Sequence, residues 1–240
     1  MTTLINKPDE SLPETFYVFV NYQNLQTKHN IETTKCICSA AFLQFIEQYD
    51  RDFSSKYLRG IISAFSPNTK TPENFVERYM NGDIDYLPFS FNFNCSINFL
   101  SFFHTNITSD YKVEYDCEGH RQRYHPKFPS RLSACYAFGD YESCLKVNRL
   151  YGWSLETVRE FVLVPHEHNR VAKVNMEVVS LYRLANRISM LDVPTQQQVW
   201  AHYWNSYENF KMELPSENGH KLYETTTLWE YLIEGIMKLK

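Results

Sequence analysis

The sequence predicts an α+β domain with a curved sheet, mixed or antiparallel, and helices from the N-terminal part packed at its side. Strand signals lie near residues 16–22, 160–165, 171–179 and 226–233. Helical patterns separate these strands without the regular strand–helix–strand rhythm that is typical of a parallel α/β sheet. The chain has 240 residues, of which 43% are hydrophobic and 16% aromatic. This length and composition suit one domain spanning residues 1–240 with a substantial core.

The N-terminal part begins with a polar, proline-containing segment, residues 1–14, which we expect to form a loose tail. Residues 15–22 are rich in β-branched and aromatic side chains, which predicts a strand. Ser39 then precedes apolar residues at helical spacing, so a helix is expected over residues 40–49. Further helices are expected over residues 55–65 and 72–79.

The middle of the chain is rich in aromatic residues and asparagine between residues 86 and 104. Phe89, Phe91 and Phe93 alternate with polar residues, which predicts a strand with one apolar face. That face either joins the core or forms a platform on which nucleobases stack. Residues 111–115 alternate in the same way and are expected to be extended.

The second half offers clearer signals. Helices are expected over residues 140–151, from Ser154 for a short distance, and over residues 194–203. Residues 161–164 read as a buried strand, and apolar residues alternate with polar ones over 172–178. A turn around residues 166–169 is expected to join these two strands as a hairpin. A final strand signal runs from about 226 to 239.

Composition and motif spacing exclude several functional classes for this chain. The formal net charge of −4 gives no basic field for non-specific nucleic-acid binding. No signal-peptide pattern and no apolar run of about 18 residues occurs, so we expect a soluble, cytoplasmic protein. The six cysteines include no CxxC pair, and the histidine spacings match no structural zinc pattern, so no metal is expected. Glycine-rich nucleotide loops are also missing.

The segment before residue 138 carries the first candidate binding group. Two prolines, at positions 126 and 129, favour an extended approach to Ser130, Arg131 and Ser133. Arginine binds phosphate through two parallel charge-assisted hydrogen bonds, and on a strand residues 131 and 133 would share one face. The alternative is an arginine that holds a loop by bonding backbone carbonyl groups.

The second candidate is a carboxylate inside an apolar run near the C-terminus. Glu230 is flanked by Trp229 and Tyr231, and a buried carboxylate is costly unless it is paired or hydrogen-bonded. It either faces water from an edge strand or projects into a cleft. In a cleft it would hold a ribose hydroxyl or stabilise positive charge on a ribosyl carbon. Glu234 competes for this role.

Three short motifs carry a resemblance to known proteins. In order along the chain they are residues 129–133, the pair Tyr203-Trp204 and residues 229–232. They resemble a group of bacterial domains, the domain of unknown function family numbered 2441, and their pattern is similar to that of ADP-ribosyltransferases. The resemblance covers the second half of the chain and the strand at Tyr17. It implies a split, strongly curved sheet around a NAD cleft.

The resemblance also implies roles for individual residues. An Arg or His on the first strand of these enzymes contacts NAD, but this first strand has neither, so Tyr17, Asn21 or Arg131 would supply the contact. The second element corresponds to residues 130–133, where Arg131 would bind the pyrophosphate beside Ser130. Ser133 and Tyr136 would shape the nicotinamide pocket. Glu230 would be the catalytic residue.

The function that the resemblance implies is mono-ADP-ribosylation, the transfer of ADP-ribose from NAD to a protein or nucleic acid. Bacterial proteins of this kind are often toxins or antiviral effectors, which implies a neutralising antitoxin partner. One alternative is a non-catalytic module that binds nucleic acid or protein through the aromatic region 86–103 with Arg121 and Arg123. Another is a NAD glycohydrolase, in which water replaces the acceptor.

Overall fold

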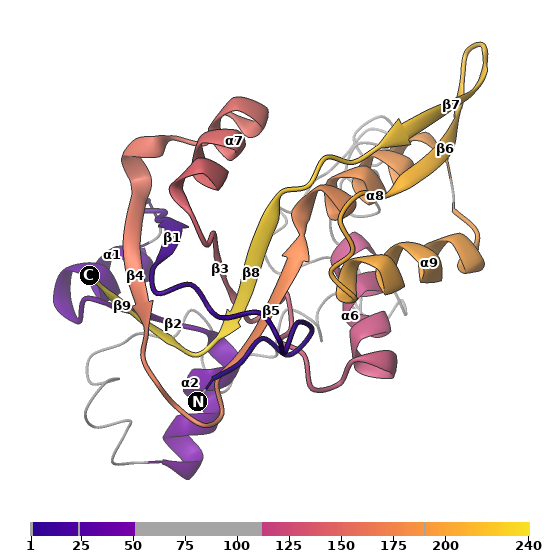
Figure 1. Cartoon of the computed structure of the whole chain (residues 1–240). Coiled ribbons are helices and arrows are strands. Elements are labelled where there is room, and N and C mark those ends of the chain that lie inside the picture. The colour runs from indigo at the N-terminus through magenta and orange to yellow at the C-terminus, as the bar shows by residue number, and fades with distance from the viewer. Residues whose placement is uncertain (1, 24, 51–111, 190) are drawn as a thin grey trace, which may run out of the picture. The chain divides into compact units, whose positions relative to one another are not determined.

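The computed structural model describes residues 2–23, 25–50, 112–189 and 191–240, and it shows a mixed α+β fold with antiparallel sheets (Figure 1). Its elements in chain order are β1 (Phe16–Phe19), α1 (Leu25–Thr33), β2 (Cys36–Cys38), α2 (Ala40–Tyr49), α6 (Lys112–Tyr124), β3 (Cys135–Ala137), α7 (Tyr141–Tyr151), the 3-10 helix η2 (Leu155–Thr157), β4 (Val158–Leu163), β5 (Arg170–Asn175), α8 (Met176–Ile188), α9 (Val193–Trp204), β6 (Lys211–Ser216), β7 (Gly219–Glu224), β8 (Trp229–Glu234) and β9 (Ile236–Leu239). The segments predicted over residues 55–65, 72–79 and 86–104 lie outside the described residues.

The chain separates into two compact units. The first contains the described residues up to 50, together with 127–174 and 228–240, and the second contains residues 112–126 and the described part of 175–227. The expectation of one domain over the whole chain stays a prediction.

The first unit is built on two sheets. One has the strand order β1-β4-β9-β2, and the other has the order β3-β8-β5. An antiparallel bridge between Tyr17 of β1 and Phe138 joins them, with two backbone hydrogen bonds of 2.8 Å. In Figure 1 β5 and β8 lie side by side and run in opposite directions. The chain also passes from one sheet to the other at Gly235, between β8 and β9.

Side chains alternate between the two sides of β1, β3 and β8, so these strands have two different faces. Phe16 and Val18 point to one side with Ala137, Tyr231 and Ile233, because successive side chains on a strand point to opposite faces. They form the core of this unit, together with Leu4, Val20, Ile31, Phe161, Val171 and Met237. The opposite side, which we term the site face, carries Tyr17, Tyr136, Glu230, Leu232 and Glu234.

The N-terminal segment is packed, contrary to the expectation of a loose tail over residues 1–14. Leu4 is fully buried and forms a parallel bridge with Val171 of β5. Asn6 exchanges two hydrogen bonds with the backbone of Lys173, at 2.8 and 3.1 Å. Glu10 forms an ion pair with the Lys173 side chain. The polar residues that suggested a tail are therefore the partners that extend the edge of β5.

Two further expectations for this unit are wrong. Residues 166–169 do not form a hairpin, because β4 and β5 belong to different sheets and the turn carries the chain from one to the other. Residues 131–133 form a turn, and β3 begins only at Cys135. The turn at residues 166–169 is present, but β4 lies between β1 and β9 whereas β5 pairs with β8.

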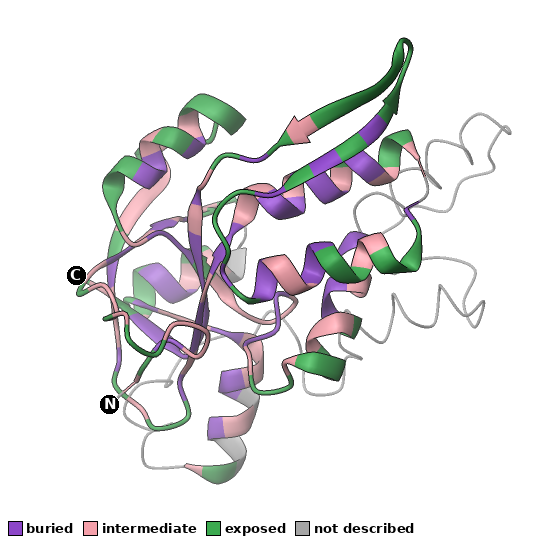
Figure 2. Cartoon of the chain, turned by 45° about the vertical axis from the view of Figure 1, so that its right-hand side comes forward, coloured by how far each residue is buried: buried purple, intermediate pink, exposed green. Residues whose placement is uncertain are grey.

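The second unit packs α6, α8 and α9 with the β6–β7 hairpin. Its interior is aromatic, with Tyr182, Trp200, Tyr203 and Trp204 all at most 2% exposed. Most of the hairpin is exposed, as Figure 2 shows. None of the helices in the described ranges combines the length and apolar character needed to cross a membrane.

Two helices of this unit correct strand predictions. The extended reading is wrong for residues 112–115, which begin α6. Val113 and Cys117 lie four residues apart and are both fully buried, which is the spacing of one helix face. The alternation over 172–178 ends at Asn175, whose side chain accepts a hydrogen bond from the backbone N–H of Glu177 at 3.2 Å and caps α8. The helix at Pro194 is confirmed as α9, capped by Asp192.

Candidate functional site

Two carboxylates lie on the site face of β8. Glu230 and Glu234 are only 4% and 2% exposed, respectively. They are four residues apart on an extended strand and therefore point to the same side. Each ionised carboxylate needs a partner because burial removes its hydration. The partners of the two differ, which separates their roles.

Glu230 pairs with Arg131, the residue that the sequence predicts to bind phosphate. The Nη1 atom of Arg131 lies 3.4 Å from Oε2 of Glu230, and both side chains are at least nine-tenths buried. The Arg131 guanidinium carbon lies 5.2 Å from the centre of the Tyr136 ring, a distance suited to a cation–π contact. The Tyr136 hydroxyl also donates a 2.5 Å hydrogen bond to the backbone carbonyl of Arg131. Tyr136 is 37% exposed, so the group runs from a surface ring to a buried carboxylate.

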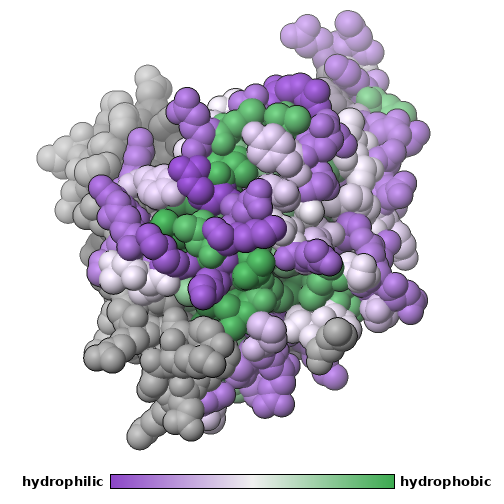
Figure 3. Space-filling model, turned by 60° about the vertical axis from the view of Figure 1, so that its left-hand side comes forward, coloured by the Kyte–Doolittle hydropathy of each residue, from purple (hydrophilic) through white to green (hydrophobic). Residues whose placement is uncertain are grey.

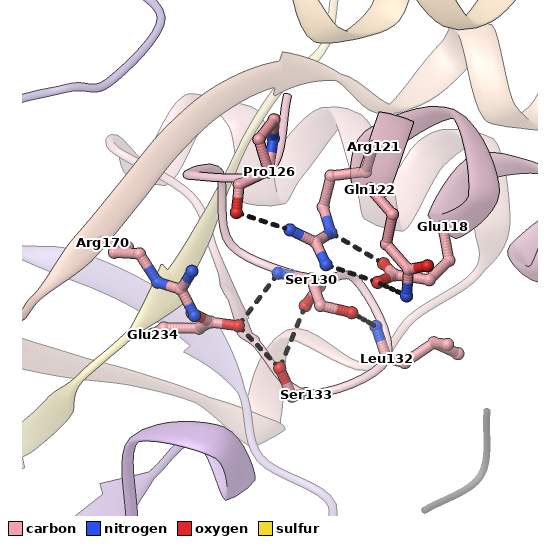
Figure 4. A network of polar contacts seen from close by, with 9 residues as sticks. All are labelled: Glu118, Arg121, Gln122, Pro126, Ser130, Leu132, Ser133, Arg170 and Glu234. Atoms are coloured by element: carbon pink, nitrogen blue, oxygen red, sulfur yellow. Dashed lines mark hydrogen bonds and ion pairs between the residues drawn. The ribbon is translucent and has the colours of Figure 1, made fainter. Parts of the chain in front are cut away.

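Glu234 is held by a different set of donors (Figure 4). Its Oε1 atom accepts hydrogen bonds from the backbone N–H of Ser130, at 2.9 Å, and from the hydroxyl of Ser133, at 2.7 Å. Its Oε2 atom forms an ion pair with the guanidinium of Arg170 on β5. The carboxylate thus links two strands of the sheet with the segment that precedes the third.

The segment between Ser130 and Ala134 is a tight, internally bonded turn. The backbone N–H groups of Ser133 and Ala134 donate to the Ser130 carbonyl at 3.2 and 2.8 Å. The Ser130 hydroxyl accepts from the N–H of Leu132 at 3.2 Å. Arg131 lies inside this turn, so the position of the turn sets the position of the Arg131 backbone. Of the predicted residues, Arg131 and Tyr136 are therefore brought together with Glu230, whereas Ser130 and Ser133 bond to Glu234.

Tyr17 and Asn21 occupy other places. Tyr17 lies on the site face, where its backbone pairs with Phe138. The centres of the Tyr17 and Tyr141 rings lie 5.9 Å apart. Asn21 follows β1, is exposed, and accepts a 3.0 Å hydrogen bond from the backbone of Gln23. These contacts involve neither Arg131 nor Glu230. Tyr17 therefore shares a face with the site, and Asn21 belongs to a surface turn.

An aromatic surface adjoins Tyr17. Tyr141, Tyr151 and Trp153, in and just after α7, are 37% to 45% exposed. The Trp153 ring packs edge-on against Phe19 of β1, with ring centres 5.2 Å apart. Hydrophobic patches between hydrophilic side chains are also visible on the face of the molecule shown in Figure 3. Flat ligands stack on surfaces of this kind.

Three residues of the site were missed by the sequence reasoning. Arg170 gave no signal, because only the pairing of β5 with β8 brings it to Glu234. Ser39 was predicted as a helix cap, but its hydroxyl accepts a 3.0 Å hydrogen bond from the N–H of Gly235. A Cβ atom at Gly235 would lie 2.7 Å from Oδ1 of Asn169, so a side chain after Glu234 would displace Asn169, which donates to the Val164 carbonyl. For these three residues, the sequence offered one signal: Gly235 directly follows the candidate carboxylate Glu234.

The charge of Glu234 also acts on a neighbouring thiol. Burial and the nearby Glu234 carboxylate raise the pKa of Cys135 to about 12. Cys135 is therefore a protonated thiol at neutral pH and does not have the thiolate character of a catalytic cysteine. Within the described parts of the chain, no group of three or more His, Cys, Asp or Glu side chains is arranged to hold a metal ion.

A second polar cluster, also drawn in Figure 4, belongs to the other unit. The buried Glu118 carboxylate accepts from Nε and Nη2 of Arg121 at 2.9 and 2.5 Å. Arg121 also donates to the carbonyl of Pro126 at 3.2 Å. This arginine, which supported the nucleic-acid-binding alternative, is thus engaged in holding the end of α6.

Comparison of the sequence with models of protein families finds no match, and comparison with curated proteins finds no relative. The resemblance to ADP-ribosyltransferases and to family 2441 therefore stays a prediction.

Proposed function

We propose that the protein is a NAD-dependent mono-ADP-ribosyltransferase with Glu230 as its catalytic residue. The observation that carries the proposal is the adjacency of β1, β3 and β8 in the first unit. The first and third elements that the resemblance assigns to the NAD site lie on β1 and β8, and the second, residues 130–133, is the turn that precedes β3. The same face holds a buried carboxylate, an arginine paired with it and the exposed aromatic ring of Tyr136. Transfer of ADP-ribose needs these three kinds of group.

In this reaction the glycosidic bond between the nicotinamide nitrogen and the ribose carbon breaks, and nicotinamide leaves with the electron pair. Positive charge then develops on the ribosyl carbon and ring oxygen, where Glu230 stabilises it. The acceptor attacks the anomeric carbon and loses its proton. Because this stabilisation acts on the transition state, Glu230 contributes more to the rate than to NAD binding.

Arg131 and Tyr136 would receive the rest of the cofactor. In the structure the guanidinium of Arg131 pairs with Glu230. The pyrophosphate of NAD would compete for the same guanidinium, because arginine binds phosphate oxygens strongly. Binding would then turn Glu230 from Arg131 toward the ribose. The exposed ring of Tyr136 offers a surface for the nicotinamide.

The test compares Glu230→Gln with the unchanged protein. Labelled NAD is incubated with separate pools of protein, RNA and DNA, and both transferred label and released nicotinamide are measured. We expect the variant to react about a hundredfold more slowly, by analogy with removal of other preorganised electrostatic groups. Its affinity for NAD should be largely kept.

The matched control is Glu142→Gln, which removes a surface carboxylate of the same unit whose side chain is 60% exposed. It should leave the rate unchanged. A Glu230→Gln protein that transfers ADP-ribose at the original rate would remove Glu230 from the mechanism. Nicotinamide release without any labelled acceptor would favour the glycohydrolase instead.

A further inference from the structure

The turn that carries Arg131 is fastened at both of its ends to one buried carboxylate. Glu234 accepts from the backbone of Ser130 at the start of the turn and from the hydroxyl of Ser133 near its end. Hydrogen bonds to a charged acceptor are stronger than those between neutral groups. The turn therefore cannot move as a unit without breaking two such bonds to β8.

Arg170 on β5 supplies the positively charged partner of Glu234. Its guanidinium pairs with Oε2 of the carboxylate, while its side chain remains 39% exposed. Removing one partner of a buried ion pair leaves the other charge without compensation, which is strongly unfavourable for the buried member. Because Glu234 is the buried member, the geometry of the turn depends on Arg170 as well.

Helix α2 completes the support. The N–H of Ala40, the first residue of the helix, donates to the Ser133 carbonyl at 3.2 Å. Ser39 and Gly235 exchange two hydrogen bonds, at 3.1 and 3.0 Å. The end of β8, the turn and the start of α2 are thus connected through short polar contacts.

We infer that Glu234 and Arg170 are positioning residues, which act on NAD only by fixing the turn from which Arg131 reaches Glu230. This inference rests on the proposed function for the role of Arg131 toward NAD. It assigns the two carboxylates of β8 to different tasks. Glu230 touches the reacting ribose, and Glu234 holds the segment that carries the pyrophosphate ligand.

The first experiment measures the accessibility of Arg131 and needs no activity. The arginine reagent phenylglyoxal is added to folded protein, and the modification of Arg131 is followed by peptide mass mapping. We expect Glu234→Gln and Arg170→Met to raise the rate at Arg131 roughly tenfold, as for loss of one charge-assisted hydrogen bond. Arg170→Lys keeps the positive charge and should restore a rate close to the original. Glu142→Gln should have no effect.

The second experiment separates positioning from catalysis. Glu234→Gln should raise KM for NAD roughly tenfold with a smaller loss in kcat, whereas Glu230→Gln should lower kcat with KM kept. An Arg131 that reacts at the original rate in both Glu234→Gln and Arg170→Met would overturn the positioning role. If accessibility rises as expected but the unchanged protein neither binds nor cleaves NAD, the positioning role stands and the proposed function fails.

Discussion

At the scale of single residues, the site depends on how buried charges are paired. The sequence identified Glu230 and Glu234 because carboxylates inside an apolar run must find partners. It also identified Arg131, for which both a ligand role and a structural role were open. The partners themselves, Arg131 for Glu230 and Arg170 for Glu234, could not be predicted. Arg131 and Glu230 are 99 residues apart in sequence, and no local pattern encodes their pairing.

Cys135 gives a residue-scale prediction. Burial and the charge of Glu234 raise its pKa to about 12, so at pH 8 almost none of it is the reactive thiolate. In the folded protein iodoacetamide should modify Cys135 at least about tenfold more slowly than in protein unfolded in urea. Peptide mass mapping at timed intervals measures both rates.

Glu234→Gln offers a control for the cause of this protection. The change removes the nearby negative charge, so the pKa of Cys135 should fall and its modification should become faster than in the unchanged protein. Equal rates for Cys135 in folded and unfolded protein would contradict the prediction.

At the scale of elements, local signals located several helices and strands well. The helices predicted over residues 40–49, 140–151 and 194–203 are present as α2, α7 and α9. The β6–β7 hairpin was missed, although Asn218-Gly219 between alternating segments is a known hairpin signal and Gly219 has a φ of 111°. Helix α6 was misread because a short window of five residues fits both periods.

The hairpin also gives an element-scale prediction. Leu214 on β6 is fully buried, whereas Leu222 on β7 is 55% exposed. Leu214→Ala should lower the free energy of unfolding by about 3 kcal/mol, because it removes buried surface and leaves a cavity. Leu222→Ala is the matched control and should change it by less than about 0.5 kcal/mol. Urea unfolding followed by tryptophan fluorescence measures both, and equal effects of the two substitutions would contradict the assigned faces of the hairpin.

At the scale of the whole molecule, the fold class followed from the irregular order of strands and helices, and the α+β fold with antiparallel sheets confirms it. The strand order could not be derived from the same patterns. Periodicity shows which face of a strand is buried, but it does not name the neighbour. β3 and β8, for example, pair across nearly a hundred residues. The NAD site therefore remains a proposal built on that pairing.

The last prediction concerns the response of the molecule to alkaline pH. Burial is the main cause that raises the pKa of Cys135, Cys144 and Tyr231 to about 12, and it also raises the pKa of Tyr182. In the unfolded chain these groups lose their protons near their ordinary values of about 8.5 to 10. Above that range the unfolded state binds fewer protons than the folded state, so the free energy of unfolding falls as the pH rises. The stabilisation is fully present below about pH 8.5 and is lost progressively toward pH 12.

The melting temperature, followed by circular dichroism, should accordingly be nearly constant from pH 7 to 8 and fall steadily above about pH 9. Each titrating group contributes at most about 1.4 kcal/mol per pH unit. Tyr231→Phe keeps the ring that packs against Phe16 but removes one titrating hydroxyl, so its alkaline decline should be shallower. A melting temperature that stays constant up to pH 11, or an equal decline in the Tyr231→Phe protein, would show that these buried groups do not govern the alkaline response.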